Sequence, residues 1–435
     1  MSHEPLKAFD ITEALPVGTT LLEASAGTGK TWTIGALVTR YLAEAVVTID
    51  ELLVITFGRA ATREMRERIR EQLVAAEAAL ADPQNCRASE NPLFRQLATG
   101  DDDDARTRRI RLQVAISDFD AGTIATTHQF CQQVLRSLGT AGDSDIDAQF
   151  TEDLSELTDQ IVDDLYVAKY TYQVNPEFTL TQAREIAHTV VRDSNSRLGD
   201  PAAQSDPIAA VRLRFAAAVR ENLDRRKRAL GLLSFDDLLR RVEAVLLQNG
   251  SVAAELMRKQ YKVVLVDEFQ DTDPVQWNVL DRAFSGHSTM VLIGDPKQAI
   301  YAFRGGDVTT YLQAAATAGT KRTLPTNWRT DSALVQALSA TFAGAELGHE
   351  QITVRPVTAH HLGSRLSNLP QSAPFRLRVL QRPTTADSIK ALPIADVRAR
   401  IAEDLADDVL ELLASKALIR TDLDERPICA GDLAV

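Results

Sequence analysis

A short loop near the N-terminus constrains the fold more than any other feature of the sequence. The run Leu21-Leu22-Glu23 leads into it, and an amphipathic helical pattern follows. This order is typical of a phosphate-binding loop, because glycines let backbone N–H groups curl around an anion and the next helix adds its positive dipole end. An ordinary glycine-rich turn is the alternative. We assign to the loop Ala24, Ser25, Ala26, Gly27, Thr28, Gly29, Lys30 and Thr31.

The last two loop residues carry the side chains that nucleotide binding requires. The Lys30 ammonium would meet the outer phosphates, and the Thr31 hydroxyl would coordinate Mg²⁺. The sequence therefore predicts a P-loop NTPase domain.

Short runs rich in Val, Ile and Leu recur and predict a parallel sheet. Helical patterns lie between several of them, as in the apolar stripe that starts at Ile34. Continuously apolar strands that alternate with helices are typical of a doubly wound α/β sheet covered on both faces. We expect strands at residues 21–24, 52–57, 123–127, 263–267 and 290–294.

Two acidic residues, Asp267 and Glu268, follow the apolar run at 263–266. In a parallel sheet they would lie at the carboxyl edge, beside the phosphate-binding loop. Asp267 would then hold Mg²⁺ through water, and Glu268 would orient or deprotonate the attacking water. An Asp-Glu pair at this position can also be a helix cap.

The sheet pattern is interrupted between about residues 150 and 231, where long Ala- and Arg-rich helical stretches replace it. We expect a helical insertion there, inside an α/β domain formed by residues 1–149 and 232–325. Residues 326–435 would begin a second α/β domain that is incomplete, with a helix at about 394–414 and a strand from Asp432. We expect exposed loops at residues 85–92 and 101–104.

The net charge of −12 is the opposite of what most nucleic-acid-binding proteins have. Basic runs at residues 106–111 and 225–228 would be candidates for a positive groove, or else solvated helix faces. Three widely spaced cysteines form no zinc pattern. Since no signal peptide or membrane-spanning apolar run is evident, we expect a soluble cytoplasmic protein.

Two longer segments indicate a particular protein family far more specifically than the phosphate-binding loop does. Residues 267–274 read DEFQDTDP and residues 294–306 read GDPKQAIYAFRGG. Both resemble motifs of the UvrD-like superfamily 1 DNA helicases, and most closely those of the RecB group. Further matches in the same order occur at residues 56–65, 126–131, 234–239 and 326–330. The first residues of the 234–239 block, Ser234 to Asp237, also form a capping-box pattern.

The resemblance implies roles for residues that the chemistry alone would leave open. Gln298 would sense the terminal phosphate of ATP, and Arg329 would stabilise charge on the transferring phosphoryl group. Contacts to single-stranded DNA would come from side chains suited to base stacking or phosphate binding, although packing in the core is the alternative for each. These are Thr56, Phe57, His128, Tyr301, Phe303 and Arg304.

The resemblance further implies a RecA-like first domain (1A), a helical subdomain (1B) and the start of a second RecA-like domain (2A). The implied activity is ATP-dependent 3′ to 5′ translocation on single-stranded DNA and unwinding from duplex ends in double-strand-break repair, with RecC-like and RecD-like partners. We expect the chain to stop before motifs V and VI and a nuclease domain. A non-motor remnant that binds ATP and DNA, a P-loop phosphotransferase and an AddA-type helicase are the alternatives.

Overall fold

The computed structural model describes residues 6–138, 149–151, 153–173, 175–192, 198–248, 250–300, 308–380, 393–421 and 424–435. The chain divides into two units, one of residues 1–24 with 30–324 and one of residues 25–29 with 325–435. Tyr301, Phe303 and Arg304, three of the predicted DNA contacts, lie outside the described residues.

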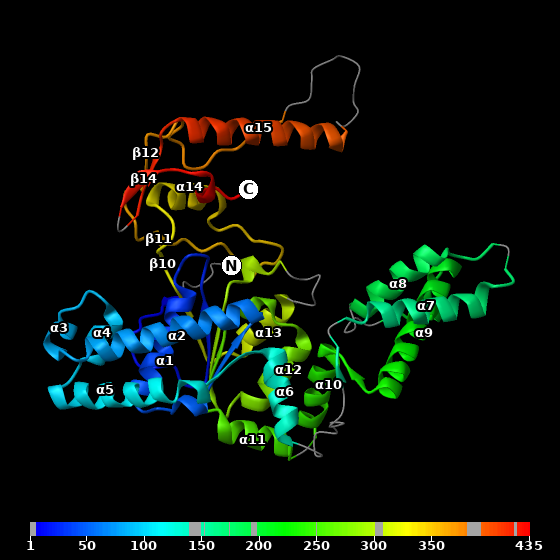
Figure 1. Cartoon of the computed structure of the whole chain (residues 1–435), viewed down its shortest axis with the longest axis horizontal. Helices are drawn as coiled ribbons and strands as arrows, with labels where there is room; N and C mark the ends of the chain where they lie inside the picture. Colours follow the sequence, from blue (N-terminus) through cyan, green and yellow to red (C-terminus); the bar gives the residue numbers. More distant parts are fainter. Residues whose placement is uncertain are drawn as a thin grey trace. The chain divides into compact units, whose positions relative to one another are not determined.

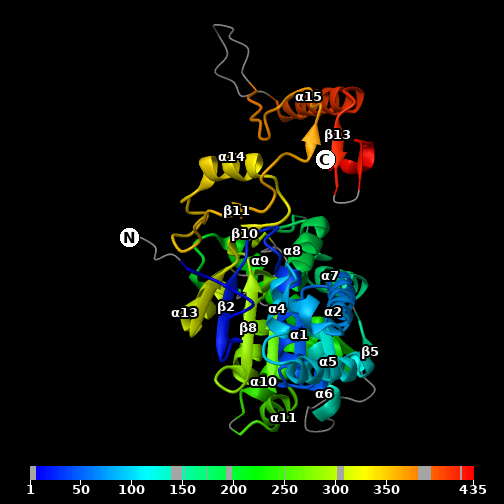
Figure 2. The same ribbon diagram turned by 90° about the vertical axis from the view of Figure 1, so that its left-hand side faces the viewer.

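In the first unit, a sheet of seven parallel strands runs in the order β1-β9-β2-β8-β7-β3-β4. Strand β2 pairs with β8 along its whole length, and the two strands lie side by side in Figure 2. The five predicted strands are all present, within one or two residues at each end. The strands are β1 (Lys7–Ala8), β2 (Thr19–Glu23), β3 (Leu52–Thr56), β4 (Thr123–Thr126), β7 (Val263–Val266), β8 (Thr289–Gly294) and β9 (Thr320–Thr323).

Each face of the sheet has its own apolar core, because successive strand residues point to opposite faces. Leu22 lies in one core and Leu21 in the other. The sheet is therefore doubly wound, as predicted, with helices on both sides (Figure 1). The first core is covered by α1 (Lys30–Ala43), α2 (Arg59–Ala79), α3 (Pro83–Arg87), α4 (Pro92–Leu97) and α5 (Asp102–Ser117). The second is covered by α6 (Thr127–Leu138), α10 (Phe235–Leu246), α11 (Val252–Gln260), α12 (Pro274–Phe284) and α13 (Val308–Thr317).

The predicted helical insertion consists of α7 (Ser155–Tyr170), α8 (Leu180–Arg192) and α9 (Pro207–Leu230). These helices pack around a separate core that includes Phe178 and Phe215. The chain enters and leaves through two short parallel strands, β5 (Gln149–Phe150) and β6 (Leu232–Leu233). The insertion is thus closed off by backbone hydrogen bonds at its base.

The second unit contains β10 (Thr326–Asn327), which pairs with β11 (Thr358–Ala359), and α14 (Ser332–Phe342). A second sheet is formed by β12 (Leu366–Ser367), β13 (Leu418–Arg420) and β14 (Glu425–Pro427). The predicted C-terminal helix is α15 (Ile394–Ala414). The strand expected from Asp432 was wrong, because Asp432 closes a 3₁₀ turn at Ala430–Asp432, where it accepts a hydrogen bond from the Cys429 backbone and pairs with Arg426.

The loop predicted at residues 101–104 was also wrong. Asp101 is the N-cap of α5, and the next three aspartates form its first turn, where carboxylates complement the helix dipole. The segment 85–92 likewise contains the end of α3 and the start of α4, which Asn91 caps. Acidic and Asn-Pro sequences that resemble loops therefore mark helix starts here.

In both basic runs, several of the cationic side chains already bind other groups of the protein. In α5, Arg108 donates to the Leu97 and Thr99 carbonyls and Arg109 pairs with Glu77. In α9, Lys227 is buried and pairs with Asp237. These side chains tie helices together, so neither run as a whole is a free positive surface. No helix in the described part of the chain is long and apolar enough to cross a membrane.

Candidate functional site

The predicted phosphate-binding loop joins β2 to α1, as the sequence pattern requires. Gly27 and Gly29 have φ angles of 77° and 88°, a region that favours glycine. Thr28 closes the turn by donating its hydroxyl to the Ser25 carbonyl at 2.7 Å. A Cβ on Gly27 would also lie 2.9 Å from Cβ of Arg329, so glycine is needed there for space as well.

The loop contacts the block that resembles motif IV. The Trp328 N–H donates to the Gly27 carbonyl at 2.8 Å, and the Asn327 side chain donates to the Ala26 carbonyl at 3.2 Å. The Asn327 carboxamide oxygen in turn accepts the backbone N–H groups of Arg329 and Thr330. Arg329 itself is exposed, and its Cβ lies close to Gly27 of the loop.

Lys30, the first residue of α1, makes an ion pair with Glu268. Their Nζ and Oε2 atoms are 2.6 Å apart, and the side chains are 12% and 33% exposed. Glu268 follows β7 with a left-handed backbone (φ 48°), which costs about 1–2 kcal/mol for a residue with a Cβ. Strain of this kind gathers at functional sites, where the surrounding contacts hold the residue in place.

Asp267 has the chemistry expected of a group that meets a cation. Its Oδ1 atom is buried and has no hydrogen-bond partner among the described residues. Burial and then the Glu268 carboxylate raise the pKa of Asp267 to about 6, and the same two causes raise the pKa of Asp271 to about 6. These crowded carboxylates therefore fit a Mg²⁺ ion, which commonly takes one or two protein carboxylates and completes its shell with water and phosphate oxygens. Among the described residues, no group of three or more His, Cys, Asp or Glu side chains is arranged to hold a metal ion.

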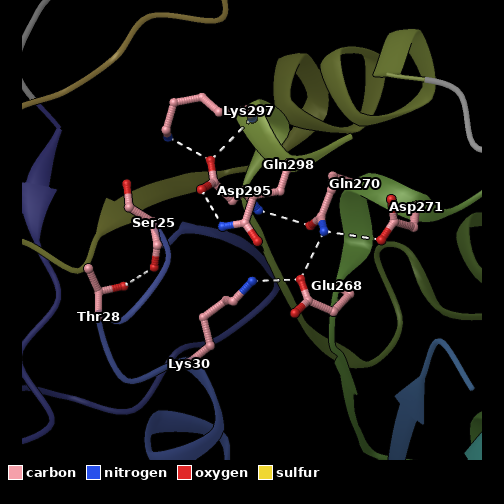
Figure 3. A network of polar contacts seen from close by, with 9 residues as sticks. All are labelled: Ser25, Thr28, Lys30, Glu268, Gln270, Asp271, Asp295, Lys297 and Gln298. Atoms are coloured by element: carbon pink, nitrogen blue, oxygen red, sulfur yellow. Dashed lines mark hydrogen bonds and ion pairs between the residues drawn. The ribbon is translucent and has the colours of Figure 1, made fainter. Parts of the chain in front are cut away.

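A polar network connects this cluster to the segment after β8 (Figure 3). Gln270 donates to Glu268 at 2.8 Å and accepts the Asp295 N–H at 2.9 Å. The Asp295 carboxylate accepts a hydrogen bond from the Gln298 amide at 2.7 Å and pairs with Lys297 at 2.6 Å. The sequence alone predicts no role for Gln270, Asp295 or Lys297, although all three lie in the two most specific motifs.

Several predicted DNA contacts lie beside the same carboxylates. A cavity of about 220 Å³ is lined by both the acidic residues and the predicted stacking residues. Phe57 is 39% exposed, and His128 packs edge-on against Phe235 with its pKa lowered by burial. Thr56, in contrast, is buried, and its hydroxyl lies 2.6 Å from that of Thr62. The cavity is lined by Ile55, Thr56, Phe57, Thr127, His128, Val266, Asp267, Glu268, Asp271, Thr272 and Gln276.

The family profile of the UvrD/REP helicase N-terminal domain matches residues 7–318. The chain belongs to this helicase family. The seven-stranded sheet, the loop at residues 24–31 and the two acidic residues after β7 all lie within the matched residues, apart from strand β9.

Curated relatives narrow the resemblance to one group within this helicase family. The chain is 51% identical to the RecBCD enzyme subunit RecB of Mycolicibacterium smegmatis over 99% of its own length and 39% of that protein. It is also 51% identical to RecB of Mycobacterium tuberculosis over 38% of that protein, and 26% identical to RecB of Escherichia coli over 46% of that protein. The chain therefore spans less than half of each of these relatives.

Proposed function

We propose that the chain is the ATP-binding part of a RecB-type DNA helicase subunit. It would bind and hydrolyse Mg-ATP and move 3′ to 5′ along single-stranded DNA in double-strand-break repair. The observation that carries this proposal is the pair formed by Lys30 and Glu268 next to the unpartnered oxygen of Asp267. This arrangement provides a cation for phosphates, a base for water and a ligand for Mg²⁺.

The proposed domain assignment follows the sequence pattern. Residues 1–149 and 232–325 would be the RecA-like domain 1A, residues 150–231 the helical subdomain 1B, and residues 326–435 the beginning of domain 2A. The separate core of α7, α8 and α9 supports treating the insertion as a subdomain of its own.

In the proposed reaction, the loop at residues 24–31 holds the phosphates. Lys30 leaves Glu268 and binds the outer phosphate oxygens instead. Thr31 and Asp267 would hold Mg²⁺, which neutralises phosphate charge when bound. Glu268, released from Lys30, would then accept a proton from the attacking water. Gln298 and Arg329 would respond to the terminal phosphate and to the charge that develops on it.

Single-stranded DNA would pass over aromatic and guanidinium side chains, which accept every base through stacking. Phe57 is the described residue that fits this role best, because it is exposed and lies beside the acidic cluster. His128 is a second stacking candidate, and Thr56 supports the loop from inside. We further propose Tyr301, Phe303 and Arg304 as contacts, duplex ends as substrates, and RecC-like and RecD-like subunits as partners.

The test is phosphate release by the purified chain with and without an oligo(dT) strand. We expect Mg²⁺-dependent hydrolysis that the strand stimulates, and we expect Lys30→Ala to abolish it. DNA affinity should fall with salt, with a log–log slope of roughly −0.7 per neutralised phosphate. Hydrolysis that ignores DNA would instead indicate a phosphotransferase, and binding without hydrolysis would indicate a non-motor protein.

A further inference from the structure

Gln270 is a buried glutamine whose side-chain oxygen and nitrogen both form hydrogen bonds. It lies in a 3₁₀ turn, Phe269–Asp271, just after the acidic pair, and is 2% exposed. Its oxygen accepts the Asp295 backbone N–H at 2.9 Å. Its nitrogen donates to Glu268 at 2.8 Å and to Asp271 at 3.3 Å. One side chain therefore bridges the residues that follow two adjacent strands, β7 and β8.

The orientation of this amide is dictated by its partners. A backbone N–H can only donate, so the Gln270 oxygen must face Asp295. An ionised carboxylate can only accept, so the Gln270 nitrogen must face Glu268. A hydrogen bond to an ionised acceptor is roughly twice as strong as a neutral one, and burial makes its loss more costly. The bridge thus has a defined direction and holds the Glu268 carboxylate.

On the β8 side of the bridge, Asp295 connects Gln270 to Gln298. The Asp295 carboxylate is 3% exposed and accepts the Gln298 amide at 2.7 Å. Lys297 balances its charge at 2.6 Å, and the same ammonium lies 3.7 Å from Glu23 at the end of β2. Figure 3 shows this connection from Glu268 through Gln270 and Asp295 to Gln298.

Gly294 allows the two segments to approach closely. A Cβ at this position would lie 2.6 Å from the Gln270 oxygen, and 3.1 and 3.2 Å from the backbone nitrogens of Gln270 and Phe269. Glycine at the end of β8 is therefore required for the bridge to fit. The Gln270 side chain forms the bridge, and the close approach of the backbone at both strand ends leaves no room for a side chain at residue 294.

We propose that Gln270 is a positioning residue that holds the Glu268 carboxylate and couples it to Gln298, an inference that rests on the proposed ATP hydrolysis. A shift of Gln298 would pass through Asp295 and Gln270 to the carboxylate that receives the proton of the attacking water. Gln270 itself need not touch the nucleotide, so its effect should be on cleavage and much less on ATP binding.

The decisive variant is Gln270→Leu, which keeps the side chain's approximate size and removes its hydrogen bonds to Glu268, Asp271 and Asp295. We expect the Kd of a fluorescent ATP analogue with Mg²⁺ to stay within about 3-fold and single-turnover cleavage to slow by about 10- to 100-fold, the effect of one charge-assisted hydrogen bond. Gln160→Leu is the matched control, because it removes an exposed 3.4 Å glutamine–glutamate contact on α7 and should change neither. Equal losses of binding and cleavage in Gln270→Leu would overturn the positioning role.

A double-mutant cycle tests the coupling. If Gln298 acts through Gln270, the variant that carries both Gln270→Leu and Gln298→Ala should cleave ATP no more slowly than the slower single variant. Losses that multiply would show independent action and overturn the coupling.

Equilibrium unfolding separates this inference from the proposed function, because it needs no ATP. The effects of Gln270→Leu and Glu268→Gln on the free energy of unfolding should be non-additive. A wild-type chain without hydrolysis but with this non-additivity would refute the proposed activity and leave the bridge standing. Additive effects would refute the bridge, whether or not the chain hydrolyses ATP.

Discussion

The ion pair between Lys30 and Glu268 leads to a prediction about Glu268→Gln. The two side chains meet at 2.6 Å, although Lys30 is the cation that the proposed ATP site uses for the outer phosphates. ATP therefore has to compete with Glu268 for this ammonium. Replacing the carboxylate with an amide of the same shape removes the competing charge and the proposed base together.

The size of the effect follows from the type of contact. A hydrogen bond to a charged partner contributes about 1.5–3 kcal/mol, and one between neutral groups about 0.5–1.5 kcal/mol. In Glu268→Gln the ammonium keeps a neutral acceptor, so Lys30 should be easier to displace by about 1 kcal/mol. Because Glu268 is one-third exposed, the value belongs at the lower end of the difference between these ranges. The Kd for Mg-ATP should fall about 5-fold.

Although Glu268→Gln should bind ATP more tightly, it should hydrolyse ATP more slowly. Loss of a general base slows the chemical step by about 10²- to 10⁴-fold. Fluorescence titration with an ATP analogue would give Kd, and rapid-quench single turnover would give the cleavage rate. Glu67→Gln is the control, since it makes the same change in charge at an exposed position of α2 and should alter neither quantity. Weaker ATP binding in Glu268→Gln would refute the competition argument, and unchanged cleavage would refute the role as base.

Three further variants test other parts of the molecule. Phe57→Ala should weaken single-stranded DNA binding by about 1–3 kcal/mol in a fluorescence anisotropy titration, without changing the melting temperature, because the ring is exposed and offers a stacking surface. Ser234→Ala should lower the free energy of unfolding by about 1 kcal/mol in urea, because the hydroxyl caps α10. Lys227→Met should lower it by about 3–5 kcal/mol at pH 7, because it leaves the partly buried Asp237 carboxylate unpaired. Burial raises the pKa of Asp237, but bonds from Lys227 and Ser234 outweigh this and lower it, so the wild-type stabilisation should be present above pH 3.8 and disappear as the pH falls below that value.

Local sequence patterns predicted most of the first unit. Buried parallel strands are apolar throughout, so β3 and β7 stand out from the amphipathic helices between them. The strand-loop-helix connection at residues 24–31 is equally clear in the sequence, because its glycine positions are set by local geometry, whereas phosphate binding by the loop stays a prediction. The helical insertion was recognised only as a change of pattern.

The errors and omissions had identifiable causes. Asp102, Asp103 and Asp104 look like a solvated acidic loop, but the same charges stabilise the first turn of a helix. The contact between Lys30 and Glu268 joins residues 238 positions apart, and no periodicity in the sequence specifies it. Gln270 escaped notice for the same reason, since its partner Asp295 follows a different strand.

The order of the strands explains why these distant residues meet. In the sheet β8 lies between β2 and β7, and all three are parallel, so their carboxyl ends share one edge. The topology therefore brings together residues that follow these three strands in the sequence. Lys30 follows β2, Glu268 and Gln270 follow β7, and Asp295 follows β8. Because Gly294, the last residue of β8, has no side chain, Gln270 can approach the end of this strand and accept the hydrogen bond from the Asp295 backbone. A substitution at the end of β8 should consequently disturb Glu268, even though it changes no group that touches ATP.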